Sequence, residues 1–111
     1  MIEKIIKDYL KEQLRLPCFL EYPENPEKRF ILIEKTGGSY ENCIKTAMIA
    51  VQSYAESMYE AAMLNEKIKE AMLRMATIND ICKVSLNSDY NYTDTEQKKY
   101  RYQAVFDINY Y

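Results

Sequence analysis

The sequence lacks the combinations of side chains that most often carry out chemistry in enzymes. It contains no histidine, which is the commonest general base, the usual partner of a serine or cysteine nucleophile and the commonest metal ligand. Gly37-Gly38 lacks the spacing and the following lysine of a phosphate-binding loop. A Ser–Lys pair, a pair of carboxylates or a reactive Cys43 stay open as alternatives, but nothing in the sequence singles one out. We therefore expect no enzymatic activity, no catalytic residue and no cofactor.

One stretch imitates the spacing of a calcium-binding loop. Oxygen-bearing residues fall at the ligand positions of an EF-hand: Ser85, Asn87, Asp89, Asn91, Thr93 and Glu96. However, the first position holds a serine instead of a carboxylate, and Tyr90 replaces the glycine of the sharp turn. The flanking segments have the pattern of strands, and Asn, Asp, Ser and Thr are common in all loops. We therefore expect no metal site here.

Length and composition indicate one small globular domain. The 111 residues are assigned to a single domain, 1–111, which is long enough to bury a core without metals or disulfides. The net charge is −2, so the basic excess of a dedicated nucleic-acid binder is missing. No segment approaches the ~20 apolar residues that cross a bilayer, and the first residues alternate charge with Ile and Leu, unlike a signal peptide. These features predict a soluble protein in a reducing cytoplasm, without membrane association.

The three cysteines, Cys18, Cys43 and Cys82, lie far apart and form no C-x-x-C pair. Their odd number argues against a disulfide framework. We expect them to behave as small core hydrophobes.

Two segments have the periodicity of amphipathic helices. In residues 2–15 apolar side chains recur at helical spacing, and Pro17 ends the segment because the residue before a proline avoids the α region. Ser57 followed by Glu60 has the spacing of a capping box. It opens a second helix up to about Ala76, whose expected buried face consists of Met58, Ala61, Ala62, Ile68, Met72 and Met75.

The first three strands are expected before the second helix. Cys18–Tyr22 and Arg29–Thr36 flank the turn-forming run Pro23-Glu24-Asn25-Pro26, which predicts a hairpin. Gly37-Gly38 ends the second of these strands, and we expect positive φ there because these are the only two glycines. Ile44–Ala55 alternates without a clearly polar side, which favours a central strand covered on both faces over a helix.

Two further strands follow the second helix. Cys82, Val84 and Leu86 alternate with polar residues, and a polar loop of about Ser88–Lys99 comes next. In the last strand apolar side chains line one face: Tyr100, Tyr102, Ala104, Phe106, Ile108 and Tyr110. The order α-β-β-β-α-β-β predicts an α+β fold, with a mostly antiparallel sheet of about five strands and two helices.

Tyrosine is abundant, with 11 residues. It is enriched at protein interfaces, it can stack on nucleic-acid bases, and it also favours strands. The missing basic excess argues against base stacking. We assign Tyr100, Tyr102 and Phe106 to the core, and Tyr90 and Tyr92, in the polar loop, to an interface.

Four short motifs resemble a known family when they are taken together with the order of elements. They are the strand-to-helix junction Val51–Ser57 leading into Glu60-Ala61-Ala62, the run Leu20-Glu21-Tyr22-Pro23, the turn Glu34-Lys35-Thr36-Gly37-Gly38, and Arg101-Tyr102-Gln103. The chain resembles, over nearly its whole length, the tail-terminator (tail-completion) proteins of long-tailed phages and prophages, which are related in fold to neck and minor tail proteins.

This resemblance implies a structural virion protein. Such proteins form a hexameric ring that caps the tail tube, ends tail polymerisation and joins the tail to the head connector or neck. The implied partners are further copies of the chain, the tail tube protein and the connector, with phage DNA passing through the lumen without specific binding. The implied locations are the cytoplasm of the bacterial host during assembly, and the tail and neck of the virion.

No motif assigns the ring contacts. We expect them in the loops, because loops often carry contacts on a rigid scaffold. The loops at Ser88–Lys99 and Pro23–Lys28 are the candidates. Their proposed interface residues are Pro23, Glu24, Asn25, Pro26, Lys28, Asp89, Tyr90, Tyr92 and Asp94. Three alternatives stay open: a neck or head-closure subunit of similar fold, a single-stranded nucleic-acid-binding module that uses the tyrosines, and a small enzyme that uses Cys43.

Overall fold

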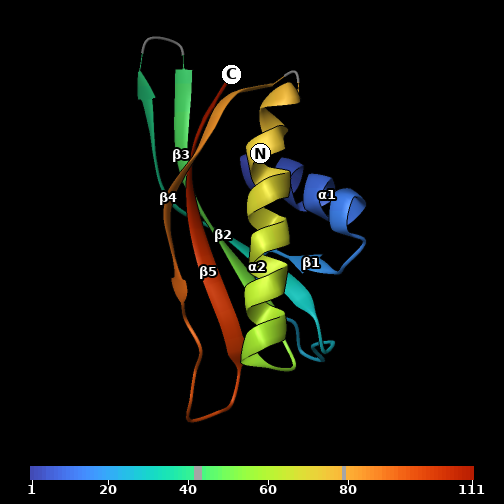
Figure 1. Cartoon of the computed structure of the whole chain (residues 1–111). Coiled ribbons are helices and arrows are strands. Elements are labelled where there is room, and N and C mark those ends of the chain that lie inside the picture. Colours follow the sequence, from blue (N-terminus) through green and yellow to red (C-terminus); the bar gives the residue numbers. More distant parts are fainter. Residues whose placement is uncertain (42–43, 79) are drawn as a thin grey trace.

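Five strands form one sheet in the order β1-β2-β3-β5-β4, with two helices packed against it (Figure 1). The computed structural model describes residues 1–41, 44–78 and 80–111. β1 and β2 are parallel, and the other neighbouring strands are antiparallel. The α+β fold and the order α-β-β-β-α-β-β are as predicted. The elements are α1 (Ile2–Leu14), β1 (Cys18–Phe19), β2 (Phe30–Glu41), β3 (Ile44–Ala55), α2 (Met58–Leu73), a 3₁₀ turn (Arg74–Thr77), β4 (Ile81–Asn91) and β5 (Tyr100–Tyr110).

Both helices cover the same face of the sheet, with α2 running along the strands and α1 lying across them (Figure 1). α1 buries Ile2, Ile6 and Leu10, which are one helical turn apart. It ends where Arg15 adopts a left-handed conformation (φ 55°) and its N–H donates to the Lys11 carbonyl. We call the face under the helices the helix face and the opposite one the open face.

The predicted start of α2 is confirmed. Ser57 is the N-cap residue, and its side-chain oxygen accepts a hydrogen bond of 3.1 Å from the backbone N–H of Glu60. Four of the predicted face residues, Ala61, Ile68, Met72 and Met75, are buried. Ala62 is only half-buried, and Met58 is exposed, with its sulfur beside Asn91 and Thr93.

The prediction of a central strand at Ile44–Ala55 is also confirmed, since β3 lies between β2 and β5. Its second half, from Ile49 to Ala55, is buried throughout. The helix-face residues belong to the main core, whereas Tyr54 on the open face stacks with Phe30 in a second, smaller cluster. Burial on both sides explains why the sequence here shows no polar face.

The predicted hairpin around Pro23-Glu24-Asn25-Pro26 is wrong. β1 has only two residues, and Cys18 pairs with Ile31 in a parallel bridge. Residues 20–29 therefore cross from the end of β1 back to the start of β2. Pro23 and Pro26 carry no N–H to donate to a ladder, and Tyr22 packs its ring on Phe30 instead of extending a strand.

Gly37-Gly38 does not end β2, which continues to Glu41, and neither glycine has positive φ. The ladder with β3 is instead shifted by a bulge between Lys35 and Gly37. A Cβ atom on Gly38 would lie 3.0 Å from Cε of Lys35 and 3.1 Å from the carbonyl oxygen of Thr46. Close packing is thus the reason for glycine at position 38.

The loop predicted at Ser88–Lys99 is shorter than expected, because β4 continues through Asn91. The polar residues of this stretch join the strand since they find partners there, as described below. Residues 92–99 form the loop itself, closed by a two-way backbone pair between Asp94 and Lys99 at 3.0 Å. Lys98 takes the left-handed turn position, with φ 53°.

The predictions for the cysteines and the last strand hold in part. Cys18 is buried, Cys82 is exposed, and Cys43 lies outside the described residues. A bulge between Ile81 and Lys83 turns Ile81 toward the core in place of Cys82. In β5, Phe106 is fully buried as expected, whereas Tyr100 and Tyr102 are only half-buried because they lie beyond the main core.

Candidate interaction surface

The two loops proposed as interface segments lie at the same end of the molecule, next to the start of α2 (Figure 1). We call this region, made of residues 20–29, residues 92–99 and the first turn of α2, the loop end. The β2–β3 hairpin marks the opposite end, which we call the hairpin end. Three segments that are distant in sequence therefore present one common surface.

An aromatic cluster on the open face anchors the first loop. The rings of Phe30 and Tyr54, which are neighbours across β2 and β3, are stacked with centroids 4.4 Å apart. Tyr22 packs edge-on against both, at 5.8 Å from each. Such edge-on contacts suit the charge distribution of aromatic rings. The loop is thus held onto the sheet by one tyrosine.

Two cations connect this cluster with the second loop. The Lys99 ammonium lies 4.5 Å from the centre of the Tyr22 ring. The Arg101 guanidinium lies between two tyrosines, 4.4 Å from the Tyr92 ring and 5.6 Å from the Tyr54 ring. It also donates hydrogen bonds to the Tyr54 hydroxyl (2.8 Å) and to the Tyr92 carbonyl (2.6 Å).

A chain of hydrogen bonds across three strands fixes Tyr90. The Tyr54 hydroxyl donates to Gln52 (3.1 Å), and the Gln52 amide donates to Gln103 (2.8 Å). The Gln103 amide in turn donates to the hydroxyl of Tyr90. Tyr90 also meets Tyr92 edge-on at 5.9 Å. Both predicted interface tyrosines are therefore exposed but held in place, which lowers the entropy cost of a contact.

The first-loop candidates lie on the surface. Pro23 is half-buried, and the other four are exposed: Glu24, Asn25, Pro26 and Lys28. Arg29 ties the end of this loop to α2, because its guanidinium donates to both oxygens of Glu56 (2.9 and 3.0 Å) and pairs with Glu60 at 3.0 Å. The hydrogen bond from Arg29 holds the pKa of Glu56 below its usual value.

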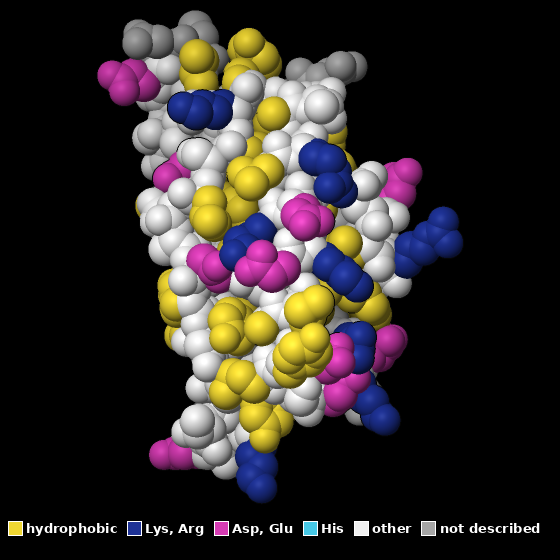
Figure 2. Space-filling view, in the orientation of Figure 1, with side chains coloured by type: hydrophobic (Ala, Val, Ile, Leu, Met, Phe, Trp, Pro, Cys, Tyr) yellow, Lys and Arg dark blue, Asp and Glu magenta, His cyan; other side chains and the backbone are white. Residues whose placement is uncertain are grey.

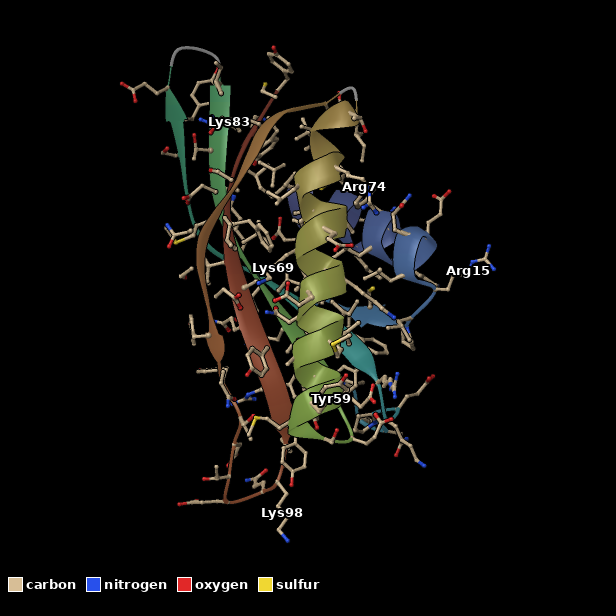
Figure 3. All side chains as sticks on the ribbon, viewed as in Figure 1. Arg15, Tyr59, Lys69, Arg74, Lys83 and Lys98 are labelled. Atoms are coloured by element: carbon tan, nitrogen blue, oxygen red, sulfur yellow. The ribbon has the colours of Figure 1, made fainter. Side chains whose placement is uncertain are left out.

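Two of the predicted interface residues also make contacts within the fold. The Asp94 carboxylate accepts from the backbone N–H groups of Glu96 and Gln97 and so shapes its own turn. Asp89 points to the helix face, where it accepts a 2.6 Å hydrogen bond from Asn65 and pairs with Lys69, which also pairs with Glu66 (Figure 3). Hydrogen bonds from Lys69 to these two carboxylates raise the pKa of its ammonium.

The sequence prediction missed several residues of the loop end. Tyr22, Lys99 and Arg101 connect the loops, and Met58 and Tyr59 expose apolar surface beside them. Figure 2 shows hydrophobic side chains gathered over the lower half of the molecule, and Figure 3 places Tyr59 and Lys98 at this end. Tyr59 is 69% exposed. An aromatic residue in the first turn of α2, outside the apolar stripe, was the one signal available in the sequence.

The EF-hand-like spacing falls on a strand rather than a loop. Along β4, Asn87 reaches Asp107 on the open face, whereas Asp89 binds α2 on the helix face. These side chains therefore diverge. Across residues 1–41, 44–78 and 80–111 no three of the potential metal ligands His, Cys, Asp and Glu come together.

Two other features of the molecule bear on possible chemistry. Burial raises the pKa of the Cys18 thiol to about 11, so this cysteine is a poor nucleophile at neutral pH. A groove of about 580 Å³ lies at the end of α1, and its lining includes Lys7, Lys11, Arg15 and Glu27.

Within the described part of the chain, no helix is both long and apolar enough to cross a bilayer.

No protein-family model matches the chain, and no curated protein matches it in sequence.

Proposed function

We propose that this chain is a structural subunit of a phage or prophage tail, which forms a ring on the tail tube, ends tube polymerisation and joins the tail to the head connector. The observation that carries the proposal is the arrangement of distinct surfaces at opposite ends of one elongated sheet. A terminator ring needs two different axial faces, one for the tube and one for the connector.

The principal extents of the molecule are 44 × 25 × 24 Å, so its two ends are well separated. The loop end presents the exposed tyrosines Tyr59 and Tyr92 together with charged loops. The hairpin end presents Ile44 and Tyr111. In a ring whose axis follows the long direction, these ends become the two axial faces, and each offers the aromatic and apolar residues that are enriched at interfaces.

The fold supports the proposal, because the resemblance to tail terminators implies the same order of helices and strands. The partners in this proposal are further copies in a hexameric ring, the tail tube protein and the connector or neck protein. Phage DNA passes through the lumen without specific binding, consistent with a net charge of −2. Assembly takes place in the cytoplasm of the bacterial host.

Disruption of the gene in the phage or prophage that encodes it tests the proposal, with particles examined by negative-stain electron microscopy. Filled heads beside unattached tails of uncontrolled length are expected. Tails of normal length that fail to join heads would assign the chain to the neck. Intact infectious particles would overturn the structural role. A complemented strain is the control.

A further inference from the structure

Both edges of the sheet have unused capacity for strand pairing. β4 is the outer strand on one side. On the other side, β1 covers β2 only at Ile31 and Leu32, so residues 33–41 have no outer strand neighbour in the described part of the chain. An exposed edge presents free N–H and C=O groups and acts as a template for another strand.

We propose that copies of this chain join side by side by antiparallel pairing of residues 33–41 of β2 in one copy with residues 83–91 of β4 in the next. Three successive antiparallel pairs separate β2 from β4, so the two strands run in opposite directions. A neighbouring copy with the same orientation therefore continues the sheet. This inference rests on the proposed ring and names its lateral interface.

Opposite charges define the register. When Lys35 lies opposite Asp89, continued pairing along the strands brings Glu41 opposite Lys83. Shifting the register by two residues in either direction, the smallest shift that keeps the side chains on their faces, removes both pairs. Opposite charges directly across strands stabilise pairing, whereas like charges oppose it.

The faces of the sheet agree with this register. Lys35 is opposite Ile49 in β3, and Asp89 is opposite Ala104 in β5, so both lie on the helix face. Glu41 lies opposite Ile44 and Lys83 opposite Asn109, which places both on the open face. Figure 3 shows Lys83 toward the hairpin end, the end at which Glu41 completes β2.

The local charge balance at Asp89 favours the same partner. Asp89 and Glu66 share a single cation, Lys69. This group retains one negative charge, and its Lys69 side chain is only 17% exposed. Lys35 of the neighbouring copy supplies the missing positive charge at a partly desolvated position, where an ion pair is screened less than on an open surface.

The shapes of the two edges also match. β2 has its bulge between Lys35 and Gly37, and β4 has one between Leu86 and Ser88. In the proposed register these irregularities lie beside each other, so both strands change spacing at the same height. Above them Tyr40, which is 67% exposed, faces Val84 and lies diagonal to Leu86, which is 41% exposed.

A hollow lies beside the lower part of the free edge. It has a volume of about 350 Å³ and is lined by Met1, Glu3, Leu20, Ile33, Glu34 and Lys35. In the proposed register this hollow receives the end of β4 from the next copy, with Asn91 opposite Ile33 on the helix face. The contact is head-to-tail, so it produces a closed ring when the rotation between copies closes.

Disulfide trapping tests the register. Ser39 and Ser85 lie opposite each other on the open face, so a Ser39→Cys, Ser85→Cys variant, in a background with Cys43→Ser and Cys82→Ser, is expected to form a covalent ladder on mild oxidation. Neither single variant should form dimers, because each copy supplies only half of the contact. A mixture of the two single variants should stop at the dimer.

Ser39→Cys combined with Thr95→Cys is the matched control, since Thr95 is exposed but lies in the loop after β4. Equal cross-linking in this control, homodimers of either single variant, or no ladder at the highest soluble concentration would overturn the pairing. A ladder with normal particles after gene disruption would preserve the pairing and overturn the tail role. Tails of uncontrolled length after gene disruption, together with no covalent ladder, would preserve the tail role and overturn the pairing.

Discussion

The ammonium of Lys99 lies 4.5 Å from the centre of the Tyr22 ring, and this contact joins two loops that are distant in sequence. Since Tyr22 packs on Phe30 and Tyr54, Lys99 also fixes the second loop on the open face. The loop end is thus a single surface whose two halves depend on each other.

Replacement Lys99→Met is expected to lower the free energy of unfolding by about 0.5–1 kcal/mol, the usual contribution of a partly exposed cation–π pair. Hydrogen exchange of residues 20–29 should accelerate at the same time, although the substitution lies in the other loop. Lys98→Met is the control, because Lys98 points away from the cluster (Figure 3). Equal effects of the two variants would show that the contact does not couple the loops.

Replacement Asp89→Asn is expected to destabilise the isolated chain by about 1–3 kcal/mol, because Lys69 and Asn65 then lose a charged acceptor. Urea unfolding measures the change. Glu70→Gln is the control and should have little effect, because Glu70 is exposed on α2, the helix that also carries Asn65 and Lys69. Full stability of Asp89→Asn would contradict a role for Asp89 inside the fold and restore it as a purely external contact residue.

Charge reversal probes the proposed lateral pairing without cysteines. Glu41→Lys and Lys83→Glu should each reduce association, because each places like charges opposite one another across the copies. The double variant should regain it, since the pair is restored with inverted sign. Light scattering over a concentration series measures the result. No rescue in the double variant would contradict the register, and wild-type association in both single variants would contradict the contact.

The two described cysteines should differ in reactivity. In a Cys43→Ser background, Cys82 is expected to react rapidly with a thiol reagent, whereas Cys18 should react only after unfolding. The folded pKa of Cys18, about 11, exceeds the ordinary value of 9.0. Its contribution to stability is therefore complete below the ordinary value and is lost as the pH rises toward the folded one. A rapidly reacting Cys18 would contradict its burial.

The pair Arg29–Glu56 should make part of the stability sensitive to acid. The folded pKa of Glu56 is lowered, first by the hydrogen bond from Arg29. Its contribution is therefore present above the unfolded carboxyl pKa and is lost as the pH falls through the folded one. Unfolding midpoints of the wild type and Glu56→Gln should converge in acid, whereas Glu24→Gln should follow the wild type throughout. A constant difference would contradict the assignment.

The sequence predicted the elements well where burial determines the pattern. Ser57 and Glu60 identified the start of α2, and the strict alternation in residues 100–110 identified β5. Pairing was harder to predict. The direction of β1 depends on the path of residues 20–29. That path is determined by the packing of Tyr22 on Phe30 and Tyr54, which the local sequence pattern does not reveal.

The candidate surface was only partly predicted, because its residues act through partners that are distant in sequence. Asp89 looked like a loop residue, but Lys69 and Asn65 hold it in a strand. Arg101 appeared to be one polar residue in an alternating strand, although it lies between Tyr54 and Tyr92. Single-sequence patterns contain the types of these residues but not the register that brings them together.

The sheet order also has a consequence for synthesis in the cell. β5 is made after β4, yet it lies between β3 and β4. Lys45 must wait for Tyr110, its partner in the register, so the central ladder cannot form while the ribosome is still translating β5. Until then β3 has no strand neighbour on one side. The nascent chain therefore exposes an unpaired strand edge, which can bind chaperones or pair incorrectly with other chains.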